Sequence, residues 1–129
     1  MIIAVGTDLV DVVRLQDRLA RHPALAARLL TARERELCGA RAESLAARVA
    51  AKEAVLKALG SALEAAGHEV PGGWRMSDIE VVSRPGSPPR LEVTGVVARA
   101  AAQLGAARWH LSLAHDAGLA QAFVVAESD

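Results

Sequence analysis

Aromatic residues are scarce in this sequence of 129 residues, which has no tyrosine, one phenylalanine and two tryptophans. So few rings argue against a stacking surface for single-stranded nucleic acid. The one cysteine, Cys38, cannot form an internal disulfide. No apolar run approaches the roughly 20 residues that a membrane span requires. The first ten residues contain neither a basic leader nor a small-residue cleavage site, so we expect a cytoplasmic protein without a membrane anchor.

Several widespread motifs are also absent. The chain has no Walker-type phosphate loop, no G-x-G-x-x-G fingerprint and no G-x-S-x-G elbow. Nucleotide hydrolases, dinucleotide dehydrogenases and serine hydrolases therefore lose their usual support. No Cys-x-x-Cys or His-x-x-x-His spacing occurs either, so we do not expect a structural zinc site.

Charge is balanced overall but unevenly distributed. Basic and acidic side chains number 15 each, yet the segment from Arg14 to Arg48 holds eight arginines and only four acidic residues. Arg14, Arg18 and Arg21 are spaced to share one side of a helix. This excess fits either an acidic partner or a solvated face of mixed charge, and the count does not separate the two. Zero net charge and few aromatics disfavour a nucleic-acid partner.

Apolar periodicity and turn residues predict one α+β domain over residues 1–129. Because hydrophobic residues make up 52% of the chain and many are alanines, we expect some apolar surface to be buried against other copies. The helices are predicted over 11–22, from a Thr31–Glu34 capping box to 38, over 43–59 with a stop at Gly60 or a continuation to 66, and over 95–104. The strands are predicted over 2–5, ending at Gly6 and Thr7, over 79–82 and 91–94 as a hairpin, and over 109–114 and 119–126.

Three segments carry side chains with chemical potential. In the first, Asp8 follows the predicted strand, where a carboxylate is either a rigidly held reactive group or simply the N-cap of the next helix. In the second, Glu53 and Lys57 are four residues apart on the long helix, which also carries Arg48 and Lys52. Such a helix can offer a carboxylate and several cations to a bound group, although an i,i+4 pair of this kind is more often a surface ion pair of little value.

The third segment runs from Trp109 to Asp116 and contains two histidines. Alternation along a strand places His110 and Ser112 on one face and Leu111 and His115 on the other. The two histidines therefore do not form a joint metal pair, and a lone histidine at a strand end is usually structural.

Read in order, these segments resemble the holo-acyl-carrier-protein synthases, a small bacterial group of 4′-phosphopantetheinyl transferases. The family pattern G-x-D-[IVL]-[VA]-[ED]-[IV]-x-R matches from Gly6 to Arg14, and R-[FW]-A-x-K-E-A-x-x-K-A-[LF]-G matches from Arg48 to Gly60 with Val49 in place of the aromatic residue. The late pattern S-[IL]-[ST]-H matches from Ser112 with Ala114 in place of the hydroxyl residue. The resemblance spans nearly the whole chain.

The resemblance implies transfer of the 4′-phosphopantetheine arm of coenzyme A to a serine of an apo acyl carrier protein, with release of adenosine 3′,5′-bisphosphate. It implies that Asp8 and Glu53 hold Mg²⁺, while Lys57 contacts a phosphate oxygen. Either Glu53 or a metal-bound water would take the serine proton.

The family's fold is an antiparallel sheet packed against a long helix, assembled as a homotrimer with coenzyme A between neighbouring copies. The implied coenzyme A contacts are Arg48, Lys52, Gly86, Pro88, Pro89 and His115. Among these, Arg48 is the first choice for a phosphate because a guanidinium can grip it with two hydrogen bonds. Arg14, Arg18 and Arg21 would steer the acidic carrier.

Two departures from the family patterns and one rival function bear on this interpretation. Val49 removes aromatic bulk beside Glu53, and Ala114 removes a hydroxyl group, so affinity is affected more than chemistry. The rival is a non-catalytic module that binds an acidic protein through the arginines. It predicts that Asp8 and Glu53 are dispensable, whereas the transferase requires both.

Overall fold

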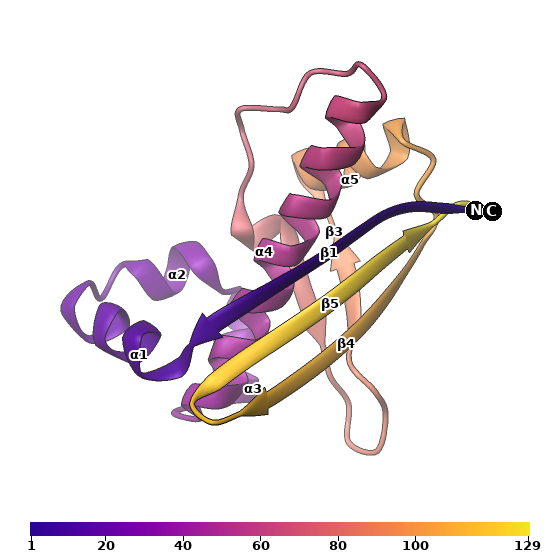
Figure 1. The fold of residues 1–129 in the computed structure, drawn as a ribbon. Helices are drawn as coiled ribbons and strands as arrows, with labels where there is room; N and C mark the ends of the chain where they lie inside the picture. Colours follow the sequence, from indigo (N-terminus) through magenta and orange to yellow (C-terminus); the bar gives the residue numbers. More distant parts are fainter.

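The computed structural model describes residues 1–129 and confirms the predicted α+β class, with an antiparallel sheet packed on a long helix (Figure 1). Three strands form the main sheet in the order β1 (Ile2–Asp11), β5 (Leu119–Glu127) and β4 (Arg108–Asp116). A tight turn at Ala117 and Gly118, both with positive φ, joins β4 to β5. The chain termini lie side by side, because the backbone N–H of Ser128 donates to the carbonyl of Met1 at 2.8 Å.

β1 is longer than the sequence predicts. The prediction that Gly6 and Thr7 end the strand is wrong, since β1 continues to Asp11. Antiparallel pairing with β5 runs without interruption through this region and satisfies its backbone groups, so tertiary pairing overrides the local signal. The Thr7 hydroxyl adds a hydrogen bond to the carbonyl of Ala122 at 2.9 Å.

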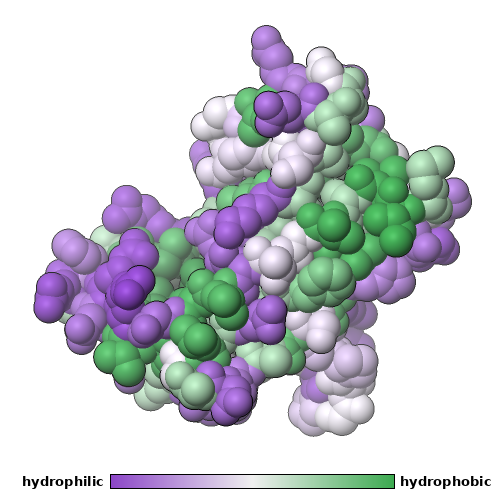
Figure 2. All heavy atoms as spheres, viewed as in Figure 1, coloured by the Kyte–Doolittle hydropathy of each residue, from purple (hydrophilic) through white to green (hydrophobic).

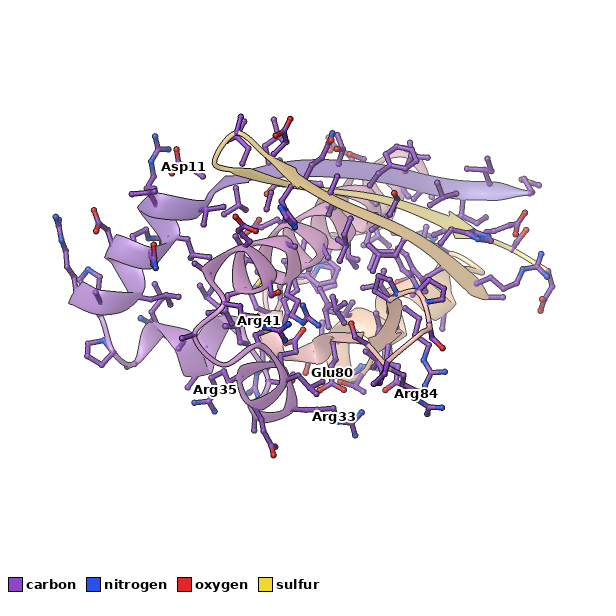
Figure 3. The ribbon with its side chains drawn as sticks, turned by 90° about the horizontal axis from the view of Figure 1, so that it is seen from below. Asp11, Arg33, Arg35, Arg41, Glu80 and Arg84 are labelled. Atoms are coloured by element: carbon purple, nitrogen blue, oxygen red, sulfur yellow. The ribbon has the colours of Figure 1, made fainter.

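The N-cap of the following helix, α1 (Val12–Arg21), is Asp11 and not Asp8. Its side chain accepts a hydrogen bond from the backbone N–H of Arg14 at 2.9 Å. Asp8 lies within the strand, three residues before Asp11, which stands where β1 passes into α1 (Figure 3), so the Asp8 carboxylate is free of a capping role.

One face of the main sheet packs on α4 (Ala42–Ala65), which continues through Gly60 (Figure 1). Large apolar side chains such as Val49, Val55 and Leu59 form only part of the buried surface of α4, because many of its buried residues are alanines. These fully buried alanines are Ala46, Ala50, Ala51, Ala54 and Ala58. The inward residues of β5 are equally small: Ala120, Ala122, Val124 and Ala126. Small side chains on both surfaces let the strand and the helix approach closely.

The remaining elements are α2 (Leu25–Leu29), α3 (Ala32–Cys38), η1 (Met76–Asp78), β2 (Ile79–Val82), β3 (Arg90–Val93) and α5 (Gly95–Gln103). Of these, α3, β2 and α5 pack against α4, whereas α2 packs against η1. β2 and β3 form the predicted hairpin as a separate two-stranded sheet. The predicted capping box at the start of α3 is confirmed, since the Thr31 hydroxyl and the Glu34 carboxylate each accept a backbone N–H of the other residue. None of the helices is both long and apolar enough to cross a membrane.

The face of the main sheet that points away from α4 is apolar and exposed. Val5 and Leu9 of β1 and Leu119 and Phe123 of β5 are each 41% to 59% exposed. Figure 2 shows this apolar surface over the sheet. Nothing in a single chain covers it.

Candidate active site

The crossing of β1 over α4 sets the geometry of the site. A Cβ atom added at Gly6 would overlap the carbonyl oxygen of Ala54 and lie 3.0 Å from the Cβ of Ala58. Only glycine permits this separation between strand and helix. Asp8 lies two residues further along β1, and therefore on the same face, so the close crossing brings its carboxylate next to α4.

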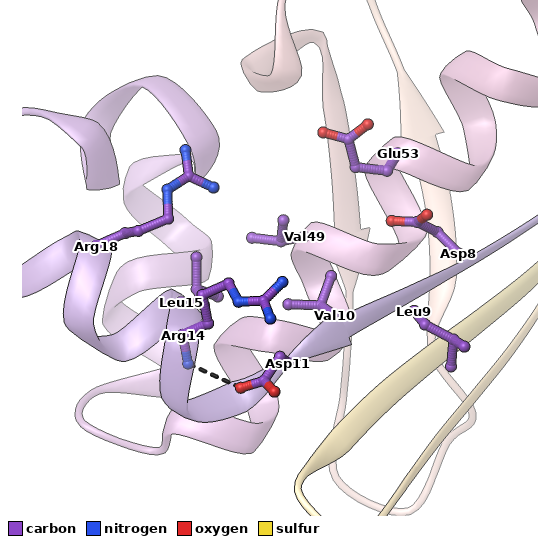
Figure 4. A pocket seen from close by; sticks show the side chains of 9 residues that line it. All are labelled: Asp8, Leu9, Val10, Asp11, Arg14, Leu15, Arg18, Val49 and Glu53. Carbon is purple, nitrogen blue, oxygen red and sulfur yellow. Dashed lines mark hydrogen bonds between the residues drawn. The ribbon is translucent and has the colours of Figure 1, made fainter.

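Asp8 and Glu53 line one pocket of about 210 Å³. Figure 4 shows the two carboxylates near each other, one from β1 and one from α4. Arg14 and Arg18 of α1 line the same pocket, and Val49 forms part of its apolar wall. The structure thus brings together two acidic side chains and two of the three arginines that the sequence analysis singled out. Arg21, the third, is exposed at the C-terminal end of α1.

Lys57 binds Asp8 and not its helical neighbour Glu53. The Lys57 Nζ atom lies 2.5 Å from Asp8 Oδ1. The Asp8 side chain is 16% exposed and that of Lys57 is 58% exposed. The hydrogen bond to Asp8 raises the pKa of Lys57, so the ammonium group is charged at neutral pH. Lys57 therefore does not form a surface ion pair with Glu53, the alternative that their spacing on the helix allowed.

The donor set of this pocket suits a hard cation. Two carboxylates supply only oxygen, which Mg²⁺ prefers, and Mg²⁺ keeps several positions for water and substrate oxygens. No group of three or more His, Cys, Asp or Glu side chains that could hold a metal ion occurs in the chain, at this pocket or outside it. Asp8 and Glu53 therefore fit an ion that shares its coordination with a substrate, and they do not fit a metal enclosed by protein alone.

Lys52, which was expected to contact a nucleotide, lies in the interior. Its side chain is fully buried, and Nζ is 2.5 Å from Glu34 Oε1 and 3.2 Å from the carbonyl of Met76. Burial lowers the pKa of Lys52, and the Glu34 carboxylate opposes this shift. Both partners come from the protein itself, so Lys52 does not offer its charge to a ligand. The prediction that Lys52 contacts the nucleotide is therefore wrong, and its role is structural.

Arg48 lies nearly buried beside the end of β2. Its guanidinium donates to the Ser83 hydroxyl at 3.0 Å and to the Ser44 carbonyl at 3.3 Å, while Nε has no partner. The proline-rich turn that follows Ser83 encloses a hollow of about 100 Å³ lined by Pro88. The hollow also has three polar lining residues that sequence analysis missed, Arg84, Ser87 and Arg90. The sequence did contain a signal for this hollow, because an arginine stands on each side of the proline-rich turn.

Gly86 and Pro89 belong to the same turn, where Gly86 has a φ of 76°. His115 lies near the end of β4 in the main sheet, with Nδ1 3.2 Å from the Glu43 carboxylate. It lines a third hollow of about 280 Å³, together with Leu9. Within one chain, Pro88 and His115 therefore line hollows other than the pocket of Asp8 and Glu53.

Comparisons with known proteins show the family to which the chain belongs. Residues 4–125 match the family profile of the 4′-phosphopantetheinyl transferase superfamily. The chain is 53% identical to a holo-[acyl-carrier-protein] synthase of Frankia casuarinae over 127 residues, with 98% of each chain covered. The acyl carrier protein synthase of Mycobacterium tuberculosis superposes with a TM-score of 0.78 at 32% identity, with both chains fully covered. The Helicobacter pylori holo-[acyl-carrier-protein] synthase, solved in complex with coenzyme A, superposes with a TM-score of 0.78 at 26% identity, covering 95% of this chain and 99% of that one. The chain thus belongs to the 4′-phosphopantetheinyl transferase superfamily, as one of its holo-acyl-carrier-protein synthases.

Proposed function

We propose that the protein transfers the 4′-phosphopantetheine arm of coenzyme A to a serine of apo acyl carrier protein, with Mg²⁺ as cofactor and adenosine 3′,5′-bisphosphate as the second product. The observation that carries the proposal is the meeting of Asp8 and Glu53 in one open pocket, from elements far apart along the chain. The reaction belongs to fatty acid biosynthesis, in the cytoplasm.

Asp8 and Glu53 would hold the metal ion in this reaction. Mg²⁺, when bound, neutralises charge on the diphosphate oxygens and orients them for in-line attack. Lys57 extends from the same helix and would place its ammonium group on a phosphate oxygen. Glu53 forms no ion pair, and it is the side chain that would accept the proton of the attacking serine hydroxyl.

Coenzyme A would lie in a cleft between neighbouring copies of a homotrimer. The exposed apolar side chains on the outer face of the main sheet support such an assembly, because apolar side chains gathered on a surface mark interaction sites. The separation of Pro88, His115 and Asp8 into different hollows of one chain also supports it. Arg48 would contact the nucleotide and its phosphates, and a neighbouring copy would contribute the turn at Gly86, Pro88 and Pro89 together with His115.

The carrier would dock on α1. Arg14 and Arg18 line the pocket itself, so an acidic helix that contacts them lies next to the reacting groups. We expect the double variant Arg14→Glu/Arg18→Glu to raise KM for the carrier strongly at low salt. Arg99→Glu, which reverses one positive charge on the exposed side of α5, is the control. An unchanged KM in the double variant would remove the arginine face from the proposal.

Mass spectrometry of the carrier tests the function directly. Purified protein, coenzyme A and Mg²⁺ should add one phosphopantetheine mass to apo acyl carrier protein, and Asp8→Asn and Glu53→Gln should abolish the gain while retaining the fold. Glu64→Gln, an exposed carboxylate on the same helix, should retain activity. Full activity in Asp8→Asn would favour the rival, a non-catalytic module that binds acidic proteins.

A further inference from the structure

Lys57 is the only cationic side chain that pairs with Asp8. Its Nζ atom lies 2.5 Å from Asp8 Oδ1, whereas neither Arg14 nor Arg18 forms an ion pair, although both line the pocket. Glu53 precedes Lys57 by about one helical turn and has no cationic partner. Asp11, the third carboxylate of the pocket, accepts the backbone N–H of Arg14 as the N-cap of α1. Of the other two, Asp8 and Glu53, Lys57 neutralises only Asp8.

This contact occupies an oxygen that a divalent cation would need. Two carboxylates in one pocket repel each other, and an ammonium group beside one of them reduces this repulsion. A divalent ion and the Lys57 ammonium would in turn repel each other if both remained at Asp8. The Lys57 side chain is 58% exposed and flexible, so releasing it from Asp8 costs little.

We propose that Lys57 is an internal counterion of Asp8 that leaves the carboxylate when a divalent cation binds. The released ammonium group remains on α4 one turn from Glu53, within reach of a phosphate held by the same ion. One lysine thus serves two states, since it stabilises the pair of carboxylates before the metal binds and contacts the substrate afterwards. This inference rests on the proposed function, because it requires that Asp8 and Glu53 hold a divalent ion.

The two roles predict effects of opposite sign for one substitution. Lys57→Met removes the competing cation, so the affinity for a divalent ion in the absence of coenzyme A should increase about tenfold. The same variant should lower kcat, because the phosphate contact is lost. Lys57→Arg keeps the positive charge and should bind the ion about as weakly as the wild type. A merely structural role for Lys57 predicts that affinity and activity fall together.

The experiment is a titration of the intact protein with Mn²⁺, without coenzyme A, followed by water-proton relaxation. Arg99→Gln removes one positive charge far from the pocket and should leave the Mn²⁺ affinity unchanged. Circular dichroism and a thermal melt verify the fold of each variant, and Lys57→Gln serves as a second neutral variant.

The outcomes separate the inference from the function on which it rests. Mn²⁺ binding that is lost in Asp8→Asn but unchanged or weakened in both Lys57→Met and Lys57→Gln would overturn the counterion role and leave the metal site intact. Mn²⁺ binding that is equally strong in Asp8→Asn and Glu53→Gln would overturn the metal site itself and, with it, this inference.

Discussion

Gly6 lies directly against the carbonyl oxygen of Ala54, with no room for a Cβ atom between strand and helix. This contact sets how closely β1 crosses α4, and so where Asp8 stands relative to Glu53. We expect Gly6→Ala to push the two elements apart, to lower the free energy of unfolding by about 3 kcal/mol and to reduce kcat at saturating Mg²⁺. Urea denaturation and the carrier-modification assay measure the two effects.

Gly60→Ala is the matched control for this variant. Gly60 lies within α4, and a Cβ atom there would meet nothing within 4 Å. Because alanine has a higher helix propensity than glycine, Gly60→Ala should be neutral or stabilise the protein by up to about 1 kcal/mol. Wild-type stability and kcat in Gly6→Ala would show that the crossing does not position the site.

Some features of the fold could be predicted from the sequence, and the full length of β1 could not. The order of the predicted elements, the capping box at Thr31 and the hairpin follow from local signals, and the structure confirms them. The short helices α2 and η1 were not predicted. The continuation of β1 through Gly6 does not follow from local signals, because the pairing with β5 and the contact with Ala54 join residues far apart in the sequence. A glycine that reads locally as a break is required here for a close approach.

The candidate site shows the same division. Asp8 and Glu53 were selected by resemblance to a family, and only the fold brings them to one pocket. The interior position of Lys52 could not be predicted from its own helix, since its partner Glu34 lies on α3. Likewise, Lys57 has a carboxylate four residues away on α4 but binds Asp8, because β1 passes beside that turn of the helix.

Removal of one partner from the buried pair of Glu34 and Lys52 should be costly. Glu34 also accepts the backbone N–H groups of Thr31 and Val81, so it joins α3, α4 and β2. Lys52→Met leaves this carboxylate buried without its cation, and we expect a loss of about 3 to 5 kcal/mol in the free energy of unfolding.

The double variant Glu34→Gln/Lys52→Met distinguishes a lost charge partner from lost packing. Since no unpaired charge remains, it should recover more than half of the loss in a urea titration. Arg90→Met, which breaks the exposed pair with Glu92, should cost less than about 1 kcal/mol and provides the reference. A double variant no more stable than Lys52→Met would point to packing.

Cys38 gives the protein a predicted pH dependence in the alkaline range. Burial raises the pKa of this thiol, so the folded state retains a proton that the unfolded state releases. The stabilisation is complete below the pKa of the unfolded thiol, roughly 8.5, and is lost as the pH rises through the higher pKa of the folded state. In that window the free energy of unfolding should fall by at most about 1.4 kcal/mol per pH unit.

Cys38→Ala isolates the contribution of the thiol. The variant should be less stable at all pH values because of the lost side chain, but its unfolding free energy should decline less steeply than that of the wild type above pH roughly 8.5. Urea titrations from pH 7 to 10 give both slopes, and the absence of tyrosine removes one other alkaline titration. Parallel slopes would contradict a raised pKa for Cys38.

Phe123 provides a test of the proposed trimer. It lies on the outer face of β5, 47% exposed, opposite Thr7 of β1 and Ser112 of β4. If this face contacts neighbouring copies, Phe123→Glu places a charge in an apolar interface, and light scattering should show folded monomers with a reduced affinity for coenzyme A. Val70→Glu is the control, because Val70 is equally exposed but lies outside the sheet. A trimer that persists in Phe123→Glu would place the contacts between copies elsewhere.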